Sequence, residues 1–181
     1  MTKTIHFKEE DRESFGILTE ILGLQDLDVV ANEIDAEKDV LHLYCTSRWD
    51  VAVCPECHQL SEKVHDYPKQ RQIHDAPLRG QKVILIFDSV RFDCKACKKP
   101  FTQPVRDVVP DCTYTQRLYE EISNPKRKQD VSTLAELYGV GYKIVESILL
   151  KAGEAKLSAR REQPLEVAHL GIDEISKKRT R

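Results

Sequence analysis

The pattern of hydrophobic and polar residues predicts a helix, then strands, then further helices. In the first segment, EEDRESFGILTEILGL, apolar residues recur at helical spacing between Asp11, a suitable N-cap, and Gly23, a suitable end. The apolar face of this helix is expected to consist of Phe15, Leu18, Ile21 and Leu22.

The following segments have the alternating pattern of β-strands. DLDVVANEID and DVLHLYCTSR are separated by the charged turn AEK, which predicts a β-hairpin. In its second arm Leu41, Leu43 and Cys45 share one face. A polar, turn-rich stretch is expected to continue to Gly80, after which QKVILIFDSVRFDC has the strongest strand pattern in the chain.

The chain becomes helical after KKPFTQP. The expected helices are YTQRLYEEIS, VSTLAELY and YKIVESILLKAGEAK, with Pro125 after the first and Gly139 after the second. QPLEVAHLGIDEIS then indicates a linker proline and a buried strand before the basic end KKRTR.

Composition indicates a folded protein of one or two small domains, because 40% of the 181 residues are apolar. No apolar run approaches the roughly 18 residues that span a bilayer. The N-terminal segment MTKTIHFKEEDRESFG has no apolar region typical of a secretory signal. We therefore expect a cytoplasmic protein with no membrane partner, whose six cysteines are reduced.

The net charge of −2 is unevenly distributed. Residues 1–53 carry five basic and twelve acidic side chains, residues 54–110 carry ten and seven, and residues 111–181 carry thirteen and eleven. The first third is therefore a poor partner for a nucleic-acid backbone, whereas the remainder has the charge to face one. Small imbalances also occur without function, so the motifs have to decide.

Four cysteines form two C-x-x-C pairs, Cys54 with Cys57 and Cys94 with Cys97. Each C-x-x-C turn directs two thiolates at one point, so two turns complete a tetrahedral zinc shell. The spacing between the pairs is longer than in common zinc ribbons, and the extra length holds an extended arm and the long strand that returns to the site. These four cysteines are the predicted ligands of a structural Zn²⁺ ion.

The letters CPECH at Cys54 also match a c-type haem attachment motif, and C-x-x-C alone matches a thiol redox pair. The haem interpretation lacks a secretory signal and the usual methionine ligand, since Met1 is the single methionine. The redox interpretation lacks the βαβ context. His58, His65 and His74 are expected to be structural or surface residues. The remaining cysteines, Cys45 and Cys112, are expected to be buried free thiols without a role.

The segment TLAELYGVGYKIVESIL has the layout of a DNA-binding helix-turn-helix. Ala135 permits close helix approach, Gly139 supplies the turn, and Val145 and Ile148 complete a small core. Gly141 stands where Ser or Thr often caps the second helix. The residues expected to contact DNA are Tyr142, Lys143, Glu146 and Ser147 in the major groove, and Lys126, Arg127 and Lys128 at phosphates. The alternative is an ordinary helical hairpin with a solvated face.

The order of these features resembles one family, the bacterial insertion-sequence transposases of the ISL-three type. The resemblance runs from about Leu22 to Thr102 through LGLQDLDV, CPEC, VHDYPKQRQIHDAPLRGQKVILI and VRFDCKACKKPFT, and the helix-turn-helix follows where the family has one. HLGIDEISKK resembles the start of the family's catalytic domain, in which an Asp ends the first strand of an RNase H-like sheet. That position is Asp173.

The resemblance implies a catalytic D, D and E triad that binds Mg²⁺ ions. Only Asp173 of this triad is present, so Asp173 would be catalytic, with Mg²⁺, only within a full-length enzyme. We expect this chain to be inactive alone, as a truncated reading frame or an N-terminal fragment. The implied partner is DNA at the terminal inverted repeats of a mobile element, in the bacterial nucleoid, and the resemblance also allows a homo-oligomer.

Two other functions stay open: a stand-alone zinc-containing DNA-binding regulator, and a zinc ribbon that serves protein contacts. The expected fold class is α+β. It comprises a β-rich, zinc-ribbon-like domain with an N-terminal helix over residues 1–108, a three-helix helix-turn-helix unit over residues 109–160, and a linker with the truncated first strand of an RNase H-like domain over residues 161–181.

Overall fold

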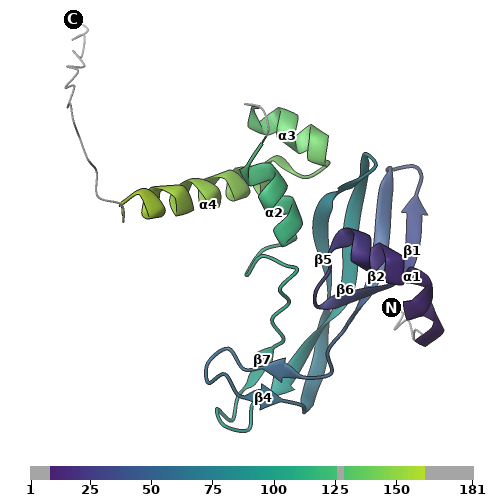
Figure 1. Cartoon of the computed structure of the whole chain (residues 1–181), viewed down its shortest axis with the longest axis vertical. Helices are drawn as coiled ribbons and strands as arrows, with labels where there is room; N and C mark the ends of the chain where they lie inside the picture. Colours follow the sequence, from purple (N-terminus) through teal and green to yellow (C-terminus); the bar gives the residue numbers. More distant parts are fainter. Residues whose placement is uncertain (1–8, 126–128, 162–181) are drawn as a thin grey trace, which may run out of the picture.

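The computed structural model describes residues 9–125 and 129–161 (Figure 1). Asp173, the expected strand around it, and the basic triplet Lys126 to Lys128 lie outside the described residues. The elements are α1 (Glu9–Leu22), β1 (Leu27–Asp35), β2 (Val40–Ser47), β3 (Ala52–Val53), β4 (Leu60–Ser61), β5 (Val64–Leu78), β6 (Gln81–Asp93), β7 (Pro100–Thr102), α2 (Gln116–Ser123), α3 (Val131–Tyr138) and α4 (Tyr142–Arg161).

A mixed sheet with the strand order β1-β2-β6-β5 forms the centre of the molecule. β1 and β2 are the predicted antiparallel hairpin, and β2 then pairs in parallel with β6, the strongest predicted strand. The short strand β7 pairs with the end of β6, while β3 and β4 form a separate two-stranded sheet. The α+β expectation is therefore confirmed.

Helix α1 packs on one face of this sheet because its apolar stripe meets the inward-facing residues of the strands (Figure 1). Phe15, Leu18 and Leu22 contact the core as predicted, but Ile21 is wrongly assigned, since its side chain is 61% exposed. The position of the sheet, and not the helical period alone, selects the buried stripe. The inward residues include Leu27, Val29, Leu41, Leu43, Cys45, Ile73, Val83, Leu85 and Phe87.

Strand β5 contradicts the expectation of a turn-rich stretch before Gly80. Its 15 residues pair antiparallel with β6, with register shifts along the ladder. Its sequence is polar because it lies at the edge of the sheet, where most of its side chains meet solvent. Ile73 is its main apolar contribution to the core.

The helices α2, α3 and α4 surround a second apolar cluster, as the sequence predicted. Thr115 caps α2 by accepting the Leu118 N–H at 3.1 Å, and Asp130 caps α3 by accepting the Thr133 N–H at 2.8 Å. Gly139 ends α3 in the left-handed conformation, with φ of 63°. The cluster contains Val109, Tyr114, Leu118, Ile122, Leu134, Val140, Val145 and Ile148, with Ala135 and Tyr138 packed against it.

A buried ion pair connects the sheet to the helices. Asp75 on β5 is 1% exposed, and its carboxylate accepts hydrogen bonds from the Thr115 hydroxyl at 2.6 Å and from Arg117 Nη2 at 2.7 Å. The backbone of residues 113–115 also bonds to His74. The charge of Asp75 is thus matched where two elements meet. The division into domains at residues 108 and 160 stays a prediction.

None of the helices in the described ranges combines the length and the apolar character that a bilayer crossing requires.

Candidate metal centre

The four predicted cysteine ligands meet at one point of the fold. Cys54 and Cys57 lie in the turn between β3 and β4, and Cys94 and Cys97 lie in the turn between β6 and β7. These elements lie at the end of the long β5–β6 ladder that is remote from α3 (Figure 1). The antiparallel β5–β6 ladder, which pairs Val64 with Phe92, brings the second turn back to the first, although 36 residues separate Cys57 from Cys94.

The sulfur atoms have the separation that a tetrahedral metal site needs. All four lie within 4.8 Å of one another, with Cys57 Sγ 3.5 Å from Cys94 Sγ and Cys54 Sγ 3.9 Å from Cys97 Sγ. A Zn²⁺ ion with Zn–S bonds of about 2.3 Å places its ligands about 3.8 Å apart. In the described part of the chain, this is the one group of three or more His, Cys, Asp or Glu side chains so placed.

Both cysteine turns share one backbone geometry. In the first, the Cys54 N–H bonds to the Gln59 carbonyl and the His58 N–H to the Cys54 carbonyl, each at 2.9 Å. Cys94, Lys98 and Lys99 repeat the pattern in the second turn. The fifth residue of each turn, His58 or Lys98, has a left-handed φ of 58° or 56°. His58 therefore shapes the turn, and it is exposed and outside the ligand group.

Thiols held this close cannot all ionise without a cation. The backbone N–H of Cys97 lowers the pKa of the Cys94 thiol to about 7, against the opposing effect of burial. The Cys57 thiol and burial raise the pKa of Cys97 above its ordinary value. The site therefore favours one thiolate, and a divalent cation supplies the charge that allows the other three to ionise.

The predicted non-ligand histidines lie outside the sulfur cluster. His65 Nδ1 is 2.9 Å from Asp93 Oδ1, and Lys63 Nζ is 2.7 Å from the other oxygen of that carboxylate. His74 is partly buried on β5, and desolvation lowers the pKa of its imidazole. Cys45 is a buried free thiol as expected, whereas Cys112 is only half-buried and corrects that expectation.

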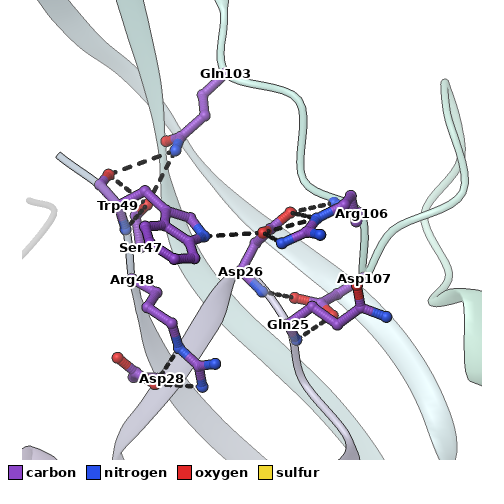
Figure 2. A network of polar contacts seen from close by, with 9 residues as sticks. All are labelled: Gln25, Asp26, Asp28, Ser47, Arg48, Trp49, Gln103, Arg106 and Asp107. Atoms are coloured by element: carbon purple, nitrogen blue, oxygen red, sulfur yellow. Dashed lines mark hydrogen bonds and ion pairs between the residues drawn. The ribbon is translucent and has the colours of Figure 1, made fainter. Parts of the chain in front are cut away.

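A polar network that the sequence analysis missed lies beside the ribbon (Figure 2). The Asp26 carboxylate accepts hydrogen bonds from the Arg106 backbone N–H at 2.7 Å, from Nη2 of the Arg106 side chain at 2.6 Å, and from the Trp49 indole N–H at 3.0 Å. Asp107 in turn accepts the backbone N–H groups of Gln25 and Asp26, at 2.7 and 2.9 Å. The network ties the loop before β1 to the segment that leaves β7.

The electrostatics of Asp26 show that the network stabilises its charge. Burial alone would raise the pKa of Asp26, but the hydrogen bonds and charge of Arg106, together with the Trp49 indole, lower the pKa below its ordinary 3.8. Asp26 and Arg106 are 80 residues apart, so no local signal could have paired them.

The predicted DNA-contacting residues of α4 lie on its first turns. Tyr142, Lys143 and Glu146 are exposed, and Ser147 is partly exposed. Val145 and Ile148, on the opposite face of the same turns, are fully buried against the other helices. The four residues therefore lie outside the helical core, but nothing in the structure tests whether they contact DNA.

The geometry defines residues 50–97 and the returning β7 as a four-cysteine zinc ribbon. Residues 50–97 match the family described as the zinc-finger of transposase IS204/IS1001/IS1096/IS1165. The ribbon of this chain is thus of the type found in those transposases, and the match covers well under half of the chain. Searches against curated proteins and against solved structures find no significant match. The ribbon and its sulfur geometry together support a structural Zn²⁺ ion.

Proposed function

We propose that this chain is the DNA-binding N-terminal region of an insertion-sequence transposase, which recognises the ends of its mobile element. The observation that carries the proposal is the match of residues 50–97 to a transposase zinc-finger family. The zinc ribbon stabilises the β-rich part of the chain, and α3 with α4 acts as a helix-turn-helix.

The arrangement of α3 and α4 supports the helix-turn-helix. Gly139 turns the chain in a left-handed conformation that a glycine adopts without strain, and the Val140 N–H then bonds to the Ala135 carbonyl at 3.1 Å. α4 begins at Tyr142, directly after Gly141, whose carbonyl accepts the Ile144 N–H at 2.9 Å. The C-terminal end of α4 extends away from the sheet (Figure 1), and at its N-terminal end Tyr142, Lys143 and Glu146 are exposed and accessible to a groove.

The chemistry of the exposed face suits DNA. Lys143 offers an ammonium group for a phosphate or a guanine edge, and Tyr142 and Ser147 offer hydroxyl groups. Glu146 accepts a hydrogen bond from a cytosine amino group and repels phosphates, so it favours a defined register over non-specific binding. Lys126, Arg127 and Lys128 are proposed to contact phosphates beside this helix.

The test is fluorescence anisotropy of the zinc-loaded chain with a DNA duplex selected by this protein from a random pool. Lys143→Ala is expected to weaken binding by about tenfold, the lower end of the effect of removing a side chain that reads a base edge. Replacing Lys126 and Lys128 by Ala should weaken binding to all sequences, and it should reduce the salt slope by about 1 for each phosphate that is no longer neutralised.

The control is Lys38→Ala, which removes the same charge from the β1–β2 turn, where Lys38 pairs with Asp35 and is far from α4 in the sequence. It should leave the affinity unchanged. Equal weakening by Lys38→Ala and Lys143→Ala would mean that net charge alone governs binding. Failure of the pool to yield any preferred duplex would contradict recognition of element ends.

A further inference from the structure

Of the two cysteines outside the zinc ribbon, Cys45 is buried and Cys112 is accessible to solvent. Cys112 lies in a small polar cluster between α2 and α4. Cys112 precedes α2, and the Lys151 ammonium on α4 donates a hydrogen bond to its sulfur at 3.0 Å. Arg71 on β5 donates to the Cys112 carbonyl at 3.2 Å, which fixes the backbone at this position. The thiol is half-buried and is therefore within reach of a small solute.

A second feature of the cluster indicates an unmet need for an acceptor. Tyr114 is 3% exposed, and its hydroxyl group is buried without a hydrogen-bond partner of acceptable geometry. That hydroxyl lies beside the side chains of Cys112 and Ser147; burial raises the pKa of Tyr114, and the neighbouring thiol adds to the effect. An oxygen atom added to the Cys112 sulfur would give this O–H group an acceptor.

We propose that Cys112 is a modification site that hydrogen peroxide converts to a sulfenic acid. The Cys112 thiolate attacks one peroxide oxygen, an S–O bond forms and the O–O bond breaks. Sulfur is oxidised by two electrons, and the second peroxide oxygen leaves as hydroxide, which takes up the proton that the thiol released on ionising and becomes water. The product is Cys112–SOH, with its oxygen placed to accept from Tyr114.

The surroundings of Cys112 favour this step over the same step elsewhere in the chain. The ammonium of Lys151 stabilises the attacking thiolate, and the thiol raises the pKa of Lys151, which keeps the amine charged. Cys45 lacks both conditions, because it is 5% exposed and burial raises its pKa to about 12. Zinc protects the four ribbon cysteines. The proposal does not depend on DNA binding.

The test treats the reduced, zinc-loaded chain with limiting hydrogen peroxide, traps sulfenic acid with dimedone and locates the label by mass spectrometry. Cys112 should be labelled first, and Lys151→Gln should slow labelling about tenfold, the effect in water of one charge at the 3.0 Å that separates the ammonium from the sulfur. Lys156→Gln is the matched control on the same helix, since the Lys156 ammonium donates to the Ser123 carbonyl and not to a thiol. It should leave the rate unchanged.

A further variant, Tyr114→Phe, removes the orphaned hydroxyl while it keeps the ring in the core. It should lower the yield of trapped sulfenic acid, because the product loses its donor and is oxidised further to sulfinic acid. Labelling of Cys45 before Cys112, or equal rates in the Lys151→Gln and Lys156→Gln chains, would overturn the proposal.

Discussion

Replacement of Asp26 is expected to destabilise the sheet through the loss of several polar contacts at once. Its carboxylate is 7% exposed and accepts a backbone N–H, an indole N–H and a guanidinium group. Asp26→Ala removes all of these hydrogen bonds, and it leaves the Arg106 backbone N–H without its acceptor in a partly buried place. Of this network, the loop before β1 and the segment after β7 then keep the two hydrogen bonds that the Asp107 carboxylate accepts (Figure 2).

The magnitude follows from what each partner can do after the change. The Arg106 side chain is 62% exposed, so it returns to water and its ion pair counts for only about 0–1 kcal/mol. A hydrogen bond to a charged acceptor contributes about 1.5–3 kcal/mol to stability, and both the Arg106 backbone N–H and the Trp49 indole N–H lose such a bond in Asp26→Ala. We therefore expect the free energy of unfolding to fall by about 2–4 kcal/mol.

Asp28 provides the matched control. It is also an aspartate paired with an arginine, with Arg48 Nε and Nη2 at 3.0 and 2.7 Å from Asp28 Oδ1, but its side chain is 21% exposed and that of Arg48 36%. Asp28→Ala should cost only about 0–1 kcal/mol, as exposed ion pairs do.

The assay is urea denaturation at fixed excess zinc, followed by circular dichroism, since zinc binding contributes to the apparent stability. Trp49 is the single tryptophan, so its emission reports whether the indole is without its partner in Asp26→Ala. Equal destabilisation by Asp26→Ala and Asp28→Ala, or unchanged Trp49 emission, would refute the reasoning about burial.

Two other predictions concern acid and the α3–α4 turn. The folded pKa of Asp26 lies below its ordinary 3.8, so the contribution of this carboxylate to the free energy of unfolding is fully present above about pH 4 and is lost as pH falls through the folded pKa. In acid titrations, the difference in stability between the wild type and Asp26→Asn should therefore close below about pH 4. Gly139→Ala should cost about 1–2 kcal/mol in thermal or urea unfolding, because its φ is positive and a Cβ would overlap the side chain of Lys82. Gly141→Ala meets open space at ordinary φ and should be neutral or slightly stabilising; a cost equal to that of Gly139→Ala would show that the turn conformation is not the cause.

Much of the fold was predictable because local periodicity follows burial. The β1–β2 hairpin, β6 and the three C-terminal helices all have one face in an apolar cluster, and their sequences show it. β5 was missed because this edge strand is defined by its pairing with β6 and not by an alternating pattern of its own side chains. Residues Lys69 to Gln72, for example, are all polar. Ile21 was misassigned because, with Ile17 one turn earlier, it forms a second apolar stripe that the sheet leaves exposed.

The metal site was predictable for a different reason. A C-x-x-C turn needs its two cysteines at a fixed spacing, so the ligands were visible in the sequence before any fold was known. The left-handed conformation of His58 and Lys98 was not predicted, because lysine gives no signal for it and histidine, although enriched at positive φ, adopts it in only a minority of cases. Interactions across large separations, such as Asp26 with Arg106 and Cys112 with Lys151, depend on the assembled fold.

The claim that the four cysteines bind one structural zinc ion has a direct measurement, X-ray absorption at the zinc edge with metal analysis on the reduced chain. We predict one zinc per chain with four sulfur neighbours at about 2.3 Å, and loss of the metal and of the ribbon's stability in Cys94→Ser, while Cys45→Ser keeps its zinc. A reduced, folded chain without zinc, or a metal with nitrogen or oxygen ligands in place of sulfur, would contradict the account.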